Sequence, residues 1–120
     1  MTLKVSSVQF QHRAGDKAYN LQRIAEFTRQ ALRGGTQLVV FPEMCITGYW
    51  HVPKLNAAGL AALAEPLSGP SVTAVAALAR QRGIAIGVGF LERGADDKLY
   101  NAYAVCLPDG AANKKLVGKS

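Results

Sequence analysis

The pattern of hydrophobic positions alternates between strand-like runs and helical spacing. Residues 3–10 (LKVSSVQF) are rich in β-branched and aromatic side chains, which predicts a first strand. Apolar or small residues then recur at three- and four-residue intervals on one face of a helix: Leu21, Ile24, Ala25, Thr28, Ala31 and Leu32. Asp16 is placed to cap the start of this helix, and the pair Gly34 and Gly35 supplies the left-handed residue that ends it.

The next apolar run, residues 37–41 (QLVVF), shows no alternation and predicts a strand that is covered on both faces. A strand, a helix and a second strand in one sheet predict a right-handed parallel crossover. Further along, residues 55–67 hold a short helix and Ser71 opens a longer one that ends at Gly83.

Two more strands follow, at residues 84–93 and 99–110, with a turn at 94–98 between them. The second of these strands closes in a Pro-Asp-Gly turn, after which Lys114 and Lys115 are interpreted as a solvated tail. The pattern therefore predicts an α/β layer structure with helices on a face of the sheet.

Glu43 stands two residues beyond the strand at 37–41, at the kind of position where sites of open α/β sheets gather. Its apolar neighbours predict partial desolvation, which raises the pKa of a carboxyl group toward the range useful to a general base. Position alone leaves two other interpretations open: an ion pair with an arginine, or a cap on the following segment.

Composition and charge narrow the class of protein. A chain of 120 residues with 49% hydrophobic and 18% charged residues predicts one globular domain. Half of the net charge of +6 comes from Lys114, Lys115 and Lys119, and five arginines fall on predicted helices, so we expect no nucleic-acid partner. A basic-tail nucleic-acid binder, which would depend on residues 114–120, stays the last alternative.

Candidate chemistry outside Glu43 is sparse. Cys45 and Cys106 form no disulfide or zinc pattern, which favours a reduced, cytoplasmic location. The opening residues show no leader, and no apolar stretch approaches the roughly 20 residues of a membrane span. His12 and His51 lack partners at ligand spacing, and residues 87–90 (GVGF) lack the dinucleotide fingerprint. We therefore expect neither a metal nor a cofactor.

Several motifs together resemble the nitrilase, or carbon-nitrogen hydrolase, superfamily. Residues 39–49 (VVFPEMCITGY) are similar to its strand, Phe-Pro-Glu and Thr-Gly-Tyr signature. The opening LKVSSVQF, the helix start with Asp16, Lys17, Asn20 and Leu21, the GVGFLER strand and YNAYAVCLPDG fall in register with the same family. The resemblance extends over almost the whole chain.

This resemblance implies a nitrilase-type α-β-β-α sandwich, with residues 1–120 as its N-terminal portion, about half of the full domain, and no second domain. It also implies a Glu-Lys-Cys triad that hydrolyses a small amide, nitrile or carbamoyl substrate through a thioester, with Glu43 as the base. Tyr49 is the candidate substrate-binding residue; with Trp50, packing on the sheet is the equal alternative.

The lysine and cysteine of the family fall beyond Ser120, so the chain alone is expected to be inactive. Lys119 could replace the lysine only through a shift of register, and neither Cys45 nor Cys106 matches the nucleophile. One sheet face would stay bare, which predicts a homo-oligomer or a partner chain. The alternative function is a non-catalytic interaction protein, or one half of a split enzyme.

Overall fold

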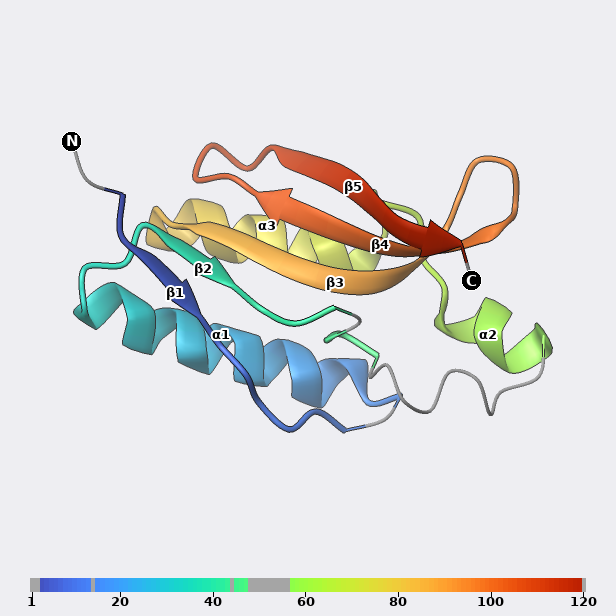
Figure 1. Cartoon of the computed structure of the whole chain (residues 1–120), viewed down its shortest axis with the longest axis horizontal. Coiled ribbons are helices and arrows are strands. Elements are labelled where there is room, and N and C mark those ends of the chain that lie inside the picture. The colour runs from blue at the N-terminus through green and yellow to red at the C-terminus, as the bar shows by residue number, and fades with distance from the viewer. Residues whose placement is uncertain (1–2, 14, 44, 48–56, 120) are drawn as a thin grey trace.

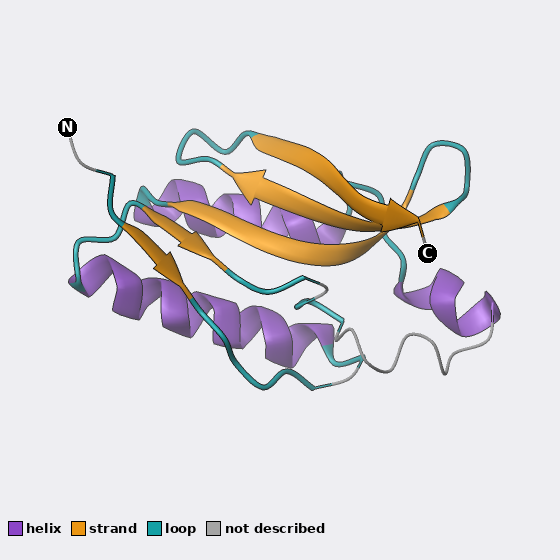
Figure 2. Ribbon diagram, viewed as in Figure 1, coloured by secondary structure: helices purple, strands orange, loops and turns teal. Residues whose placement is uncertain are grey.

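The chain forms two layers, a five-stranded mixed sheet with its main helices on one face (Figures 1 and 2). This computed structural model describes residues 3–13, 15–43, 45–47 and 57–119. The elements in chain order are β1 (Val5–Ser7), α1 (Lys17–Arg33), β2 (Leu38–Val40), α2 (Ala57–Leu63), α3 (Pro70–Arg82), β3 (Ala85–Arg93), β4 (Leu99–Cys106) and β5 (Ala112–Lys119). In Figure 1, β1 passes in front of α1, while β3 and β4 pass in front of α3.

Strand order in the sheet follows the sequence, β1-β2-β3-β4-β5. The first three strands are parallel, with Ser6 opposite Val39 and Val39 opposite Ile86. β4 and β5 then turn back as antiparallel neighbours. The predicted α/β layer structure and the parallel pairing of the first two strands are confirmed.

Both long helices begin and end at residues that the sequence marks. The Asp16 side chain caps α1 by accepting from the Tyr19 amide at 3.0 Å, and Gly35 follows the helix with φ of 80°. α3 starts at Pro70, one residue earlier than predicted, because proline lacks an N–H and fits the first turn of a helix. Gly83 ends α3 in the left-handed conformation.

The hydrophobic core lies between the helices and one face of the sheet. Val39 of β2 and Val88 of β3 are fully buried, as are Ile24 of α1 and Ala79 of α3. The alternate residues of β3 and β4 share this face and pair across the strands: Ile86 with Cys106, Val88 with Ala104, and Phe90 with Ala102. Side chains at the odd positions of β4 therefore face away from the helices.

Three expectations from the sequence differ from the structure. The first strand covers only Val5–Ser7, because Phe10 turns inward and packs against Phe27 and Phe41. β2 is covered on one face alone: Val39 is buried, while its neighbours are only half-buried. None of the described helices is long and apolar enough to cross a membrane.

The third difference is β5, which was expected to be a solvated tail. The turn at Gly110 (φ 89°) returns the chain, and the Leu107 amide bonds the Ala111 carbonyl at 2.7 Å. Backbone pairing with β4 then places Lys114 and Lys115 in an edge strand, where lysines are common because they discourage further pairing. The positive charge of this segment therefore did not predict its secondary structure.

Candidate functional site

The segment that follows β2 is fastened to β3 at two points. The Phe41 amide donates to the Gly87 carbonyl at 2.9 Å, and the Ile46 amide donates to the Gly89 carbonyl at 3.2 Å. Glu43 lies between these two points, directly beyond the carboxyl end of β2. The structure thus places Glu43 where the sequence predicted it, on a short segment with both ends held.

A helix side chain joins this segment to the one that follows β1. Asn20 of α1 is fully buried and donates to the Arg13 carbonyl at 2.9 Å and to the Ile46 carbonyl at 2.7 Å. Its Oδ1 accepts from the Arg13 amide at 2.8 Å. The Gly15 amide also bonds the Thr47 carbonyl at 2.8 Å. The two segments at the carboxyl edge of the sheet therefore form one hydrogen-bonded unit.

Glu43 itself is exposed, which corrects the expectation of partial desolvation. No described element covers the side of the sheet on which it lies. Asn101 of β4 donates from Nδ2 to Glu43 Oε1 at 3.4 Å. The ion pairs of the described residues join Lys17 to Glu65 and Arg23 to Glu26, so the interpretation of Glu43 as an arginine partner is not supported.

Asn101 and Tyr103 are the residues of this site that sequence reasoning missed. Asn101 contacts the Glu43 carboxylate, and its buried Oδ1 has no hydrogen-bond partner within the described chain. Tyr103 donates its hydroxyl to the Phe41 carbonyl at 2.7 Å. The signal that could have found both is the alternation of β4, which puts residues 101 and 103 on the face opposite the core.

Cys45, two residues after Glu43, is a structural thiol. It is fully buried, and the Gly89 amide donates to its Sγ at 3.4 Å. Burial raises the pKa of the Cys45 thiol to about 12, although hydrogen bonds from the backbone oppose the rise. Burial likewise raises the pKa of Cys106 to about 11. Both thiols stay protonated at neutral pH, as expected for cysteines that are not nucleophiles.

A second carboxylate, Glu65, is enclosed by donors. Its Oε2 accepts from Lys17 Nζ at 2.6 Å and from Ser71 Oγ at 2.5 Å, while Oε1 accepts from the Ser71 amide at 2.8 Å. Burial by itself raises the pKa of Glu65, but the hydrogen bonds from Lys17 and Ser71 together outweigh it and lower the pKa. Glu65 therefore joins the starts of α1 and α3 as a structural ion.

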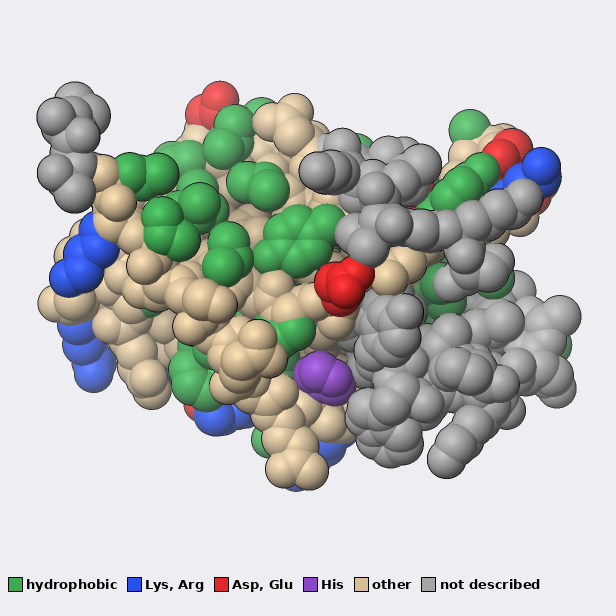
Figure 3. Space-filling view, viewed as in Figure 1, with side chains coloured by type: hydrophobic (Ala, Val, Ile, Leu, Met, Phe, Trp, Pro, Cys, Tyr) green, Lys and Arg blue, Asp and Glu red, His purple; other side chains and the backbone are tan. Residues whose placement is uncertain are grey.

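The face of the sheet that carries Glu43 is largely uncovered. Figure 3 shows hydrophobic side chains gathered over the strands on this face. Val5 is 49% exposed, and Leu38, Val40 and Tyr103 are only half-buried. We call these four residues the open face.

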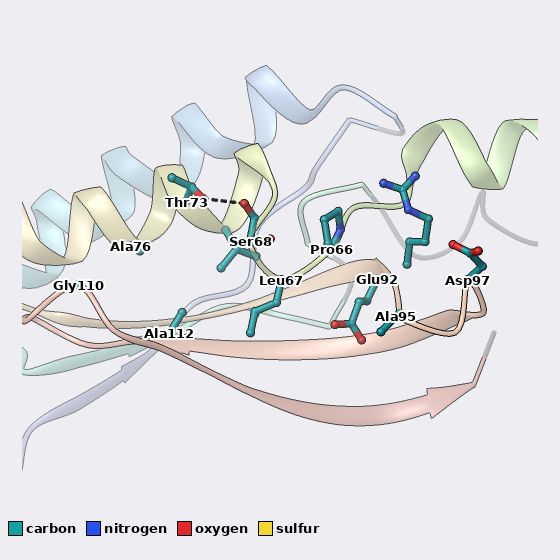
Figure 4. A pocket seen from close by; sticks show the side chains of 13 residues that line it. Pro66, Leu67, Ser68, Thr73, Ala76, Glu92, Ala95, Asp97, Gly110 and Ala112 are labelled. Carbon is teal, nitrogen blue, oxygen red and sulfur yellow. Dashed lines mark hydrogen bonds between the residues drawn. The ribbon is translucent and has the colours of Figure 1, made fainter.

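A cavity of about 670 Å³ lies on the other side, between α3 and the strands (Figure 4). Its wall includes Ala76 of α3, Glu92 of β3 and Ala112 of β5, and at its rim Thr73 donates to the Ser68 carbonyl at 3.3 Å. Glu43 does not line it. The cavity is therefore separate from the predicted site.

Two sequence-predicted candidates cannot be placed beside Glu43. Tyr49, the candidate substrate-binding residue, lies outside the described residues, as do Trp50 and His51. Lys119 is opposite Tyr100 at the end of β5, and its side chain is not described.

The comparisons with known proteins agree on one family. The profile of the carbon-nitrogen hydrolase family matches residues 4–119. The chain is 36% identical over 110 residues to an (R)-stereoselective amidase from Pseudomonas sp, covering 92% of this chain and 38% of the relative. It is 33% identical over 127 residues to an aliphatic nitrilase from Rhodococcus rhodochrous, covering 96% of this chain and 34% of the relative.

Solved structures show the same fold. A CN-hydrolase superfamily protein from Xanthomonas campestris superposes with a TM-score of 0.74 at 27% identity, over 93% of this chain and 39% of the other. The amidase from Nesterenkonia sp. AN1 in complex with acrylamide gives a TM-score of 0.71 at 19% identity. The chain spans well under half the length of these relatives, so its structure is a partial α/β domain. It belongs to the carbon-nitrogen hydrolase family.

Proposed function

We propose that this chain is the N-terminal portion of an amidase or nitrilase-type hydrolase in which Glu43 is the general base. The observation that carries the proposal is the state of Glu43: an exposed carboxylate with one long hydrogen bond from the described residues, on a segment held at both ends. Such a carboxylate has free lone pairs and a fixed position. Both are what a base needs to reach a proton on a neighbouring group.

The reaction requires two groups that the family resemblance assigns to residues beyond Ser120. A cysteine thiol gives its proton to Glu43 while its sulfur forms a bond to the carbon of an amide. A lysine ammonium stabilises the negative charge on the oxygen of the tetrahedral intermediate. When the C–N bond breaks, the departing nitrogen takes the proton from Glu43, and a thioester remains.

Glu43 acts a second time in the hydrolysis of the thioester. It removes a proton from water as the water oxygen attacks the thioester carbon, and the proton then passes to the departing sulfur. The same carboxylate thus alternates between base and acid, which demands that it exchange protons readily. Accessible lone pairs favour this use, whereas Glu65, whose carboxylate accepts three hydrogen bonds, is poorly suited to it.

The proposed substrate is a small amide, nitrile or carbamoyl compound. The relatives named amidase and nitrilase support this class, without choosing between its members. We propose Tyr49 as a residue that contacts the substrate, since it follows Glu43 closely in the chain. Substrate loops contributed by the remainder of the domain would decide the choice.

We further propose that a second sheet covers the open face in the complete protein. The half-buried Leu38, Val40 and Tyr103 and the exposed Val5 support a partner layer there, because hydrophobic side chains gain free energy when they leave water. The layer would come from the continuation of the chain, which would also supply the lysine and cysteine. The second candidate, favoured by the same face, is that a separate chain supplies this layer.

The test is hydrolysis by the complete protein. Ammonia release from a primary amide, an aliphatic nitrile, an arylacetonitrile and an N-carbamoyl amino acid should identify at least one substrate, and mass spectrometry after an acid quench should detect a thioester. Glu43→Gln should abolish both signals. The matched control is Glu26→Gln, because Glu26 is a half-buried glutamate of α1 whose ion pair with Arg23 lies on the helix.

Three results would contradict the proposal. Hydrolysis that survives Glu43→Gln would remove Glu43 as the base. Hydrolysis by a verified 120-residue chain would show that no further lysine or cysteine is needed. Co-purification of a separate chain that carries both residues would support the split arrangement instead of a continuous domain.

A further inference from the structure

We propose that Tyr103 is a positioning residue for Glu43, which it controls through the backbone of Phe41. This inference rests on the proposed function of Glu43 as the base. The Tyr103 hydroxyl donates to the Phe41 carbonyl at 2.7 Å, a bond between residues 62 positions apart in the chain. Burial raises the pKa of Tyr103 to about 12, so the hydroxyl keeps its proton at neutral pH and can donate.

Gly87 makes this bond geometrically accessible. The Tyr103 ring crosses over Gly87 so closely that a Cβ placed there would lie 2.7 Å from the tyrosine oxygen and 2.8 Å from Cε1. Real Cβ atoms do not approach other atoms so closely. Any larger residue at position 87 would therefore push the ring away and separate the hydroxyl from Phe41.

The effect on Glu43 follows from the stiffness of the intervening chain. Gly87 accepts from the Phe41 amide at 2.9 Å, and Tyr103 donates to the Phe41 carbonyl, so both polar backbone groups of Phe41 are held. Pro42 comes next, and its ring fixes φ near −65°. With Phe41 held and Pro42 restricted, few rotations remain free before Glu43.

The opposite end of the segment has its own support from Ile46, which bonds Gly89 and Asn20. Tyr103 is therefore the side chain that holds the Phe41 carbonyl, on the upstream side of Glu43, in addition to the packing of the Phe41 ring against Phe10. Its loss would leave the fold intact and allow the carboxylate to move relative to the attacking thiol. Small displacements of a catalytic group reduce the rate of the chemical step far more than they reduce substrate binding.

The experiment is Tyr103→Phe in the complete protein, with Tyr100→Phe as the matched control. Tyr100 lies on the same strand and also loses one hydrogen bond, since its hydroxyl donates to Asp96 at 2.6 Å in an exposed turn. We expect Tyr103→Phe to lower kcat about tenfold with KM within about twofold of wild type. Tyr100→Phe should leave both constants within about twofold. Rates are normalised to active sites by titration of the thioester burst.

A second variant changes Gly87, the residue over which the Tyr103 ring lies. Gly87→Ala should lower kcat in the same direction, because the added Cβ displaces the Tyr103 ring. Combining Tyr103→Phe with Glu43→Asp should give less than the product of the two single effects, because both changes act on the same carboxylate. A purely structural role would instead reduce the fraction of active protein and leave kcat per active site unchanged.

The outcomes distinguish the positioning role of Tyr103 from the catalytic role of Glu43. If Glu43→Gln abolishes activity while kcat per active site in Tyr103→Phe matches that in Tyr100→Phe, the positioning role is wrong and the catalytic role of Glu43 stands. Multiplicative effects in the double variant would also overturn the positioning role. If Glu43→Gln stays active, the proposed function fails, and the role of Tyr103 fails with it.

Discussion

Glu43 and Glu65 are two carboxylates of one chain with opposite surroundings. Glu65 is 8% exposed and accepts three hydrogen bonds, two of them from the backbone and hydroxyl of Ser71 and one from the Lys17 ammonium. Glu43 is exposed and, among the described residues, accepts one bond, from Asn101 at 3.4 Å. Three of the roughly four acceptor sites of the Glu65 carboxylate are therefore occupied, whereas most of those of Glu43 are open to the described residues.

The surroundings of a carboxylate decide whether it stabilises the fold or stays available for chemistry. The donors around Glu65 favour its charged form and lower its pKa. Protonation of Glu65 would therefore weaken its hydrogen bonds with Lys17 and Ser71 and destabilise the fold. A group held in this way is a poor shuttle for protons. Glu43 stands between Phe41 and Ile46, whose backbone amides are bonded to β3, so the segment is held without using the Glu43 carboxylate.

The largest expected effect is on catalysis, from Glu43→Gln. Under the proposed role of Glu43 as general base, its loss should reduce kcat about 10²- to 10⁴-fold in the complete protein. In the 120-residue chain, where the Glu43 side chain is exposed, the free energy of unfolding should change by less than about 0.5 kcal/mol. Steady-state kinetics of the complete protein and urea denaturation of the 120-residue chain measure the two effects. A large loss of stability would show that Glu43 has the structural role assigned to Glu65.

The reverse result is expected for Glu65→Ala. Removal of this carboxylate leaves Lys17 without its partner and the Ser71 amide without an acceptor, which should lower the free energy of unfolding by about 3 kcal/mol. Glu26→Ala is the control, since it also breaks an ion pair but a more exposed one, and should cost less than about 1 kcal/mol. Equal losses in urea denaturation would contradict the assignment of Glu65 as the structural carboxylate.

We expect a smaller effect on kcat when the hydrogen-bond donor of Asn101 is replaced with an acceptor. Asn101→Asp keeps the shape of the side chain, replaces the Nδ2 donor with an acceptor, and sets a second negative charge 3.4 Å from Glu43. We expect kcat to fall about tenfold, corresponding to about 1.4 kcal/mol of activation free energy. Asp97→Asn, in the exposed turn before β4, changes one charge elsewhere and should have no effect on kcat. Equal kcat values for Asn101→Asp and wild type would remove Asn101 from the site.

The helix ends and one of the strands could be predicted from the local sequence. The cap at Asp16, the stops at Gly35 and Gly83 and the strand at 84–93 follow from residue chemistry within a few positions. Glu43 is a candidate because the residues around it resemble a family signature, and its catalytic role stays a prediction. Features that depend on neighbours in the chain were therefore accessible without a structure.

Features that depend on distant pairing were not. Lys114 and Lys115 resembled a solvated tail, because their partner is a strand across a turn and edge strands tolerate charge. The alternation of β4 places Tyr103 on the face opposite the core, but its contact with Phe41 arises only when antiparallel pairing sets it opposite Gly89, with its ring over Gly87. The exposure of Glu43 was also mispredicted, since apolar neighbours in sequence do not ensure that any layer covers a side chain.

The smallest expected effect is the pH dependence of stability that Glu65 creates. Its pKa in the folded chain is below the ordinary value of 4.5, so the folded state binds this proton less readily than the unfolded state. The stabilisation is therefore complete above about pH 4.5 and is lost as the pH falls through the lower folded pKa. In Glu65→Gln the side chain does not titrate, so the free energy of unfolding should decline less steeply below pH 4.5 than in wild type. Parallel curves for the two proteins, from urea denaturation at successive pH values, would mean that Lys17 and Ser71 do not favour the charged form. The contrast with Glu43 would then rest on exposure alone.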